Sequence, residues 1–79
     1  MTPVPEITNQ IRRLRFENGE ISQQTLADRA GVTRQTILAI EANKYSPSLA
    51  LAFRIARAFN RTVEEVFQFS PASPGDGGA

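Results

Sequence analysis

The segment from Gln23 to Ile40 constrains the fold of this chain more than any other, because it holds two helix-forming stretches separated by very few residues. Ser22 is a favourable N-cap for the first stretch, and Thr33 is one for the second. Gly31 fits the turn between them, since glycine adopts a positive φ without a steric penalty. So short a link forces the two helices to cross steeply. The inner side of the pair is made of apolar or small residues: Leu26, Ala27, Ala30, Val32, Ile37 and Ile40.

The residues before this segment predict another helix. Ile7, Ile11 and Leu14 recur at spacings of four and three residues, which is the apolar stripe of a helix from about Thr8 to Glu17. Gly19 follows its expected end. We therefore expect three helices in the first half of the chain.

The second half predicts two more helices. Asn43 tolerates the left-handed conformation and can end the third helix, and Ser46-Pro47 supplies an N-cap and a first-turn proline for a fourth that runs to about Phe59. Thr62 and Glu65 have the spacing of a capping box, which opens a short fifth helix. The inward face of the fourth helix should consist of Leu51, Ala52, Ile55, Ala56 and Phe59.

These elements define the fold class as all-α, with five short helices. Phe67-Gln68-Phe69 alternates apolar and polar residues, so a small β element can form where it meets the N-terminal arm. A chain of 79 residues has room for one core. We expect an arm at residues 1–5, one domain at 6–70 and a flexible tail at 71–79, where Pro, Gly and Ser dominate.

Composition excludes several classes of function. The chain has no Cys and no His, so disulfides, the usual zinc sites and imidazole-based catalysis are unavailable, and we expect no enzyme, metal or cofactor. There is no apolar run of membrane-spanning length and no signal-peptide pattern, which favours a cytoplasmic protein without a membrane partner. The net charge of +1 neither requires nor excludes nucleic acid. No small-molecule ligand is evident.

The outer face of the second helix of the pair carries side chains suited to reading base pairs. A helix held with its N-terminal end and one polar face projecting outward fits the major groove of DNA. Arg34 can donate twice to guanine, with a phosphate contact as the alternative. Gln35 can read adenine, and an exposed Leu38 can meet a thymine methyl group.

The pattern Ser-Gln-x-x-Leu-Ala-x-x-Ala-Gly-Val-Thr-Arg-Gln-Thr-Ile-x-x-Ile-Glu, over residues 22–41, resembles the Cro and lambda-repressor-like family of helix-turn-helix regulators. Asn43–Leu49 and Val63–Gln68 also resemble the small single-domain dimeric repressors, including the cytolysin-type regulators. The likeness covers residues 7–69. It implies a five-helix lambda-repressor-like domain that binds double-stranded DNA.

The resemblance also assigns roles to residues around the motif. It implies that Gln23, which opens the second helix, grips the DNA backbone, and that Arg15 pairs with Glu41 as a structural contact. Many relatives have Asn where this chain has Ala42, so that phosphate contact is lost here. Independently of the resemblance, Arg12 and Arg13 are interpreted as a solvated helix face, with a basic patch as the alternative, and Arg54 and Arg57 receive the same interpretation. Weaker candidates for contact with the DNA backbone are Thr33, which can instead serve only as a cap, Thr36, Lys44 and Tyr45.

One such helix reads only a few base pairs, so we expect two copies of the chain on a palindromic site. The expected dimer contacts are Val63, Val66, Phe67 and Phe69, with closure of the monomer core as the alternative role. A rival function is a protein-interaction module, such as an antitoxin subunit or an adaptor. Salt-dependent binding to random duplex separates the two, because release of counterions gives a steep dependence on salt.

Overall fold

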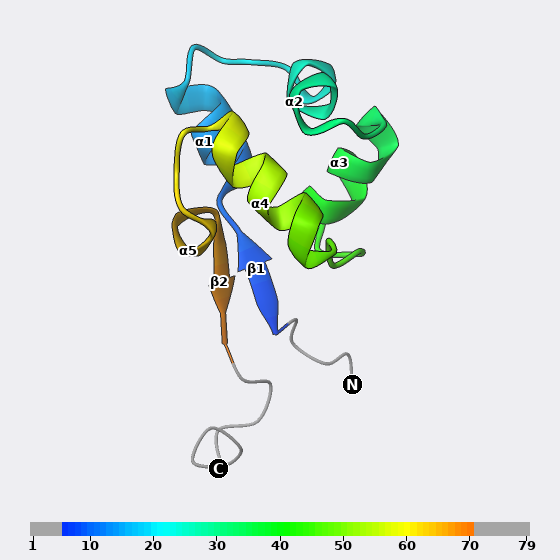
Figure 1. Ribbon diagram of the computed structural model, residues 1–79, viewed down its shortest axis with the longest axis vertical. Coiled ribbons are helices and arrows are strands. Elements are labelled where there is room, and N and C mark those ends of the chain that lie inside the picture. The colour runs from blue at the N-terminus through cyan, green and yellow to red at the C-terminus, as the bar shows by residue number, and fades with distance from the viewer. Residues whose placement is uncertain (1–5, 71–79) are drawn as a thin grey trace.

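A computed structural model describes residues 6–70, and the expected arm at 1–5 and tail at 71–79 lie outside the described residues. Five helices and a two-stranded sheet form within residues 6–70, as the sequence predicts (Figure 1). The elements in chain order are β1 (Ile7–Asn9), α1 (Ile11–Glu17), α2 (Gln23–Ala30), α3 (Arg34–Glu41), α4 (Leu49–Ala58), α5 (Val63–Val66) and β2 (Phe67–Phe69).

Side-chain caps begin four of the five helices. The hydroxyl groups of the N-cap residues accept hydrogen bonds from backbone N–H groups that have no partner inside the helix. At α5 the Glu65 side chain also accepts from the backbone N–H of Thr62, which completes the capping box. The four capping residues are Ser22, Thr33, Ser48 and Thr62.

Two expected helix starts are wrong. The first helix begins at Ile11 instead of Thr8, because Ile7–Asn9 pairs with Phe67–Phe69 as an antiparallel strand. Ile7 accordingly lies 39% exposed on the sheet instead of in a helical stripe. The fourth helix begins at Leu49, because the hydroxyl of Ser48, and not that of Ser46, accepts from a backbone N–H of its first turn.

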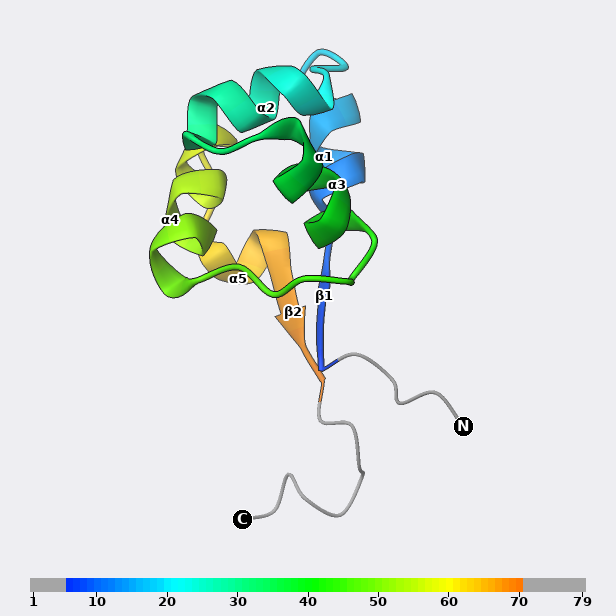
Figure 2. The same cartoon turned by 90° about the vertical axis from the view of Figure 1, so that its right-hand side faces the viewer.

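The turn of the helix pair is formed as predicted. Gly31 has a φ of 75°, in the left-handed region, and its N–H bonds to the last turn of α2. Asn43 has a φ of 59° just after α3, in agreement with its expected role as a helix terminator. The steep crossing of α2 and α3 is visible in Figure 2.

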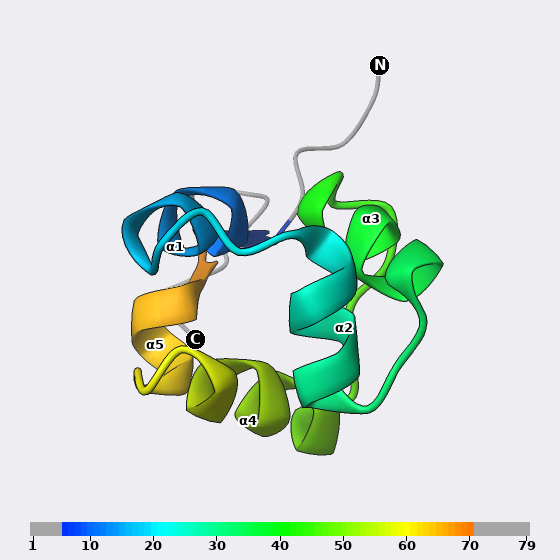
Figure 3. The same cartoon turned by 90° about the horizontal axis from the view of Figure 1, so that it is seen from above.

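A single apolar core holds the helices together. Seen from above, α1, α2, α4 and α5 surround the centre of the domain (Figure 3). The buried apolar side chains form one cluster. The expected inner residues of α2, α3 and α4 are all buried, while Val32 packs against the core from its edge. Burial of each large side chain contributes roughly 1.5–3 kcal/mol. The largest fully buried side chains are Ile11, Leu26, Ile37, Ile40, Ile55 and Val66.

Two expected dimer contacts are corrected by this core. Val66 is 0% exposed and Phe67 is 9% exposed within one copy of the chain. Their side chains therefore close the monomer core, which is the alternative role that the sequence left open, and they expose little surface to a second copy. Val63 is half-buried and Phe69 is exposed, so both remain available to a partner.

Candidate nucleic-acid interface

The outer face of α3 presents the three expected base-reading side chains together. Arg34, Gln35 and Leu38 are all exposed. Ile37 and Ile40, on the opposite face of the same helix, are buried in the core. The core therefore fixes which face of α3 turns outward, and that face carries a cation, an amide and an apolar side chain.

Thr33 is committed to capping α3. Its Oγ1 accepts from the backbone N–H of Thr36 at 3.3 Å and lies 3.0 Å from the hydroxyl oxygen of Thr36. The capping role left open by the sequence is present, whereas contact of either hydroxyl with a phosphate stays a prediction.

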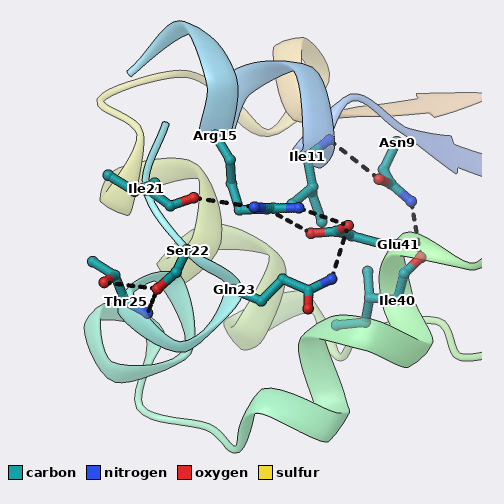
Figure 4. A network of polar contacts seen from close by, with 9 residues as sticks. All are labelled: Asn9, Ile11, Arg15, Ile21, Ser22, Gln23, Thr25, Ile40 and Glu41. Carbon is teal, nitrogen blue, oxygen red and sulfur yellow. Dashed lines mark hydrogen bonds and ion pairs between the residues drawn. The ribbon is translucent and has the colours of Figure 1, made fainter. Parts of the chain in front are cut away.

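A partly buried ion pair connects the last turn of α3 to α1 (Figure 4). Arg15 Nε donates to Glu41 Oε2 at 2.8 Å, and Arg15 Nη2 donates to Glu41 Oε1 at 3.2 Å. Arg15 Nη1 also donates to the carbonyl oxygen of Ile21, at 3.1 Å, in the loop before α2. The structural pair implied by the resemblance is confirmed, and Arg15 joins α1, the loop before α2 and the end of α3.

Gln23 belongs to the same network. It is half-buried at the start of α2, and its Nε2 donates to Glu41 Oε1 at 3.3 Å. This hydrogen bond holds the Gln23 side chain at the junction of α2 and α3. Its expected contact with a DNA phosphate stays a prediction.

A shallow hollow opens at this junction. The exposed side chains of Arg12 and Arg34 contribute positive charge to this hollow. The sequence interpretation placed Arg12 on a solvated face, with a basic patch as the alternative. Arg12 is exposed, and its three-residue spacing from Arg15 puts the two on one side of α1, where both line the hollow. The residues that line the hollow are Arg12, Arg15, Ser22, Gln23, Gln24, Arg34 and Glu41.

Lys44 and Tyr45, the remaining backbone candidates, lie in the exposed loop after α3. Tyr45 lines a different hollow, together with Ile7, Pro47 and Phe67, on the side of the small sheet. The structure thus brings Gln23 and Arg34 together but places Tyr45 apart from them.

Residues 6–70 contain no group of three acidic, His or Cys side chains that could hold a metal ion. Within the same residues, no helix is long and apolar enough to cross a membrane.

A model of the Helix-turn-helix family HTH_3 matches residues 11–66. An uncharacterized HTH-type transcriptional regulator of Methanothermobacter thermautotrophicus is 57% identical over 58 residues, which cover 72% of this chain and 83% of the relative. The HTH-type regulator YgzD of Bacillus subtilis is 48% identical over 59 residues, with 75% and 88% covered.

Two solved structures are similar in fold. The hypothetical transcription factor NHTF of Neisseria superposes with a TM-score of 0.65 at 25% identity, over 71% of this chain and 63% of that one. A candidate DNA-binding protein of Bacteroides fragilis gives a TM-score of 0.69 at 24% identity, over 78% and 98%. The second likeness supports the fold alone.

Proposed function

The chain belongs to the helix-turn-helix family of DNA-binding transcriptional regulators, and we propose that it acts as a homodimeric repressor that reads a palindromic operator through the major groove. The family is one of regulators and not of enzymes. The observation that carries the proposal is the outer face of α3, where Arg34, Gln35 and Leu38 project while the inner face is fixed in the core. A rigid helix with such a face suits direct readout of base edges.

Affinity would come from the hollow beside α3. Cationic side chains that approach phosphates release counterions, and this term supplies most sequence-independent binding. Gln23 and Arg12, at the rim of the hollow, are our candidates for contact with the DNA backbone. Arg34 lines the same hollow from the start of α3, so its guanidinium can donate either to a guanine or to a phosphate.

A panel of operator duplexes with single base changes tests these roles. Arg34→Ala should lose roughly 1–3 kcal/mol of discrimination at one base pair of each half-site, because a bidentate contact to guanine is removed. Gln23→Ala should weaken binding to every duplex alike. If Arg34→Ala lowers all affinities equally, Arg34 contacts a phosphate and the base-reading role is wrong.

Arg12 and Arg13 form a matched pair for the phosphate contact. Arg12 lines the hollow, whereas Arg13 faces Glu17 on the same helix at 3.7 Å. Arg12→Ala should reduce the slope of log affinity against log salt by about one, and Arg13→Ala should leave it near the parent value. Equal slopes for both variants would remove Arg12 from the interface.

The outer part of the small sheet is our candidate for the dimer contact. Phe69 is 68% exposed and Ile7 is 39% exposed, and the two are register partners across β1 and β2. The sheet projects from the helices on the side away from α2 (Figures 1 and 2). Ile7 also lines the hollow that contains Tyr45, just after α3. DNA binding by such a dimer requires that the two copies of α3 lie on one side of it, about 34 Å apart, which is one turn of DNA.

Sedimentation of Phe69→Asp tests the dimer. We expect a folded monomer with much weaker specific affinity, since a carboxylate in an apolar seam is costly to desolvate. Phe53→Asp, on the exposed side of α4, is the control and should remain dimeric. A dimeric Phe69→Asp would move the contact to another surface, Val63 being the next candidate.

The rival function, a module that docks a protein partner, has one observation in its favour. Leu49 and Phe53 are exposed four residues apart on α4, so they lie on one helix face. Binding to random duplex measured from low to high salt separates the two functions. A steep loss of affinity with salt supports DNA binding, and the absence of binding at low salt favours the docking module.

A further inference from the structure

The side chain of Asn9, the last residue of β1, bonds to the start of α1 and to the end of α3 (Figure 4). Its Nδ2 donates to the carbonyl oxygen of Ile40 at 2.9 Å and to Asn43 Oδ1 at 3.2 Å. Its Oδ1 accepts from the backbone N–H of Ile11 at 3.2 Å, at the start of α1. One amide group thus serves the C-terminal turn of α3 and the N-terminal turn of α1.

The Ile40 carbonyl is one of the terminal acceptors of α3. It also accepts from the backbone N–H of Asn43, whose left-handed conformation ends the helix. Asn9 and Arg15 therefore hold adjacent positions of the same turn, Ile40 and Glu41, from two separate points. The last turn of α3 is thus held by two side chains, one from β1 and one from α1.

Asn9 also connects α3 to the small sheet. Its register partner is Phe67, and Ile7 pairs with Phe69 two positions further along the same ladder. The backbone N–H of Gln10 donates to the carbonyl oxygen of Val66 at 2.8 Å, which ties this end of β1 to α5. The sheet that carries our candidate dimer contact is thus joined to α3 through the Asn9 amide.

We propose that Asn9 is a positioning residue for DNA recognition, which sets the direction of α3 relative to the sheet and so to the second copy of the chain. This inference rests on the proposed function. Arg34 lies six positions before Ile40, which corresponds to a rise of about 9 Å along α3. If α3 tilts by about 10° about Ile40, Arg34 is therefore displaced by about 1.5 Å. Contacts to base edges do not tolerate such a shift, whereas contacts to phosphates, through flexible cationic side chains, do.

Three substitutions separate the functions of the amide. Asn9→Asp retains an acceptor for the N–H of Ile11 but turns a carboxylate oxygen toward the Ile40 carbonyl, where a donor is needed. Asn9→Ser retains an acceptor near Ile11 and is too short to reach Ile40. Thr8→Val, on the other face of the same strand, is the control for general effects on the sheet.

The test is the ratio of affinities for a selected operator and for random duplex, measured at a temperature where thermal melts show each variant folded. We expect Asn9→Asp and Asn9→Ser to lower this ratio about five- to tenfold, the fold-change that loss of one hydrogen bond gives, with random-duplex affinity and Thr8→Val unchanged. If one Asn9 variant does not fold, the other decides.

Two results would overturn the inference. A ratio equal to the parent value in a folded Asn9 variant shows that the amide does not direct α3. Equal losses for operator and random duplex show that Asn9 acts only through stability. A parent protein that binds duplex without sequence preference refutes the proposed function itself, and that result is visible before any variant is made.

Discussion

Removal of Arg15 should be the most destabilising change at the junction of α1 and α3. Arg15 makes three hydrogen bonds, two to Glu41 and one to the Ile21 carbonyl, and the side chains of the ion pair are only 17% and 11% exposed. Arg15→Ala leaves the Glu41 carboxylate in a poorly solvated place with Gln23 as its remaining partner. Loss of one member of a fully buried pair costs about 3–5 kcal/mol. Because this pair retains some contact with solvent, we expect a smaller cost, of about 2–4 kcal/mol.

Thermal and urea unfolding measure this cost. For a domain of this size each kcal/mol lowers the melting temperature by about 4–8 °C, which gives a drop of roughly 8–32 °C. Arg13→Ala is the matched control on the same helix, because the Arg13–Glu17 pair lies 62% and 48% exposed at 3.7 Å and contributes less than about 1 kcal/mol. The reasoning is refuted if Arg15→Ala melts within a few degrees of Arg13→Ala.

Two further predictions concern the turn and the last helix. Gly31→Ala should destabilise the domain by about 1–2 kcal/mol in urea unfolding, because φ at this position is 75°, a conformation that alanine disfavours. The added Cβ would lie 3.4 Å from Nη1 of Arg54, at the end of a flexible side chain that can move away. An unchanged urea midpoint would contradict this prediction. The pKa of Glu65 is lowered by the hydrogen bond from the backbone N–H of Thr62, then by the Thr62 side chain and Arg61. Its contribution to stability is therefore present above its ordinary pKa of 4.5 and is lost as pH falls through the lowered value. Glu65→Gln, which keeps the acceptor, should flatten the loss of melting temperature in that acidic range, and an identical acid profile would refute the assignment.

The parts of the fold that depend on neighbouring residues were predicted from the sequence. Ser22, Thr33 and Thr62 cap helices where expected, and Gly31 adopts the left-handed conformation, because each of these features involves residues within one turn of the chain. The outward face of α3 followed from helical periodicity for the same reason. The Arg15–Glu41 pair was predicted by resemblance alone.

The errors arise where distant residues decide the outcome. Ile7 has the spacing of a helical stripe, but its strand partner, Phe69, is far away in the sequence, and nothing local reveals that pairing. Val66 is apolar, and apolarity does not distinguish a core position from a dimer seam. Asn9 was missed because its partner Ile40 is 31 residues away.

Selection of bound sequences from a random duplex library tests the central claim most directly. The account predicts enrichment of one inverted repeat, with half-site centres about 10–10.5 base pairs apart, because two copies of α3 must enter successive turns of the major groove on one side of the DNA. A selected pool that remains indistinguishable from the input library, although the protein retains duplex at low salt, would contradict sequence-specific recognition by α3.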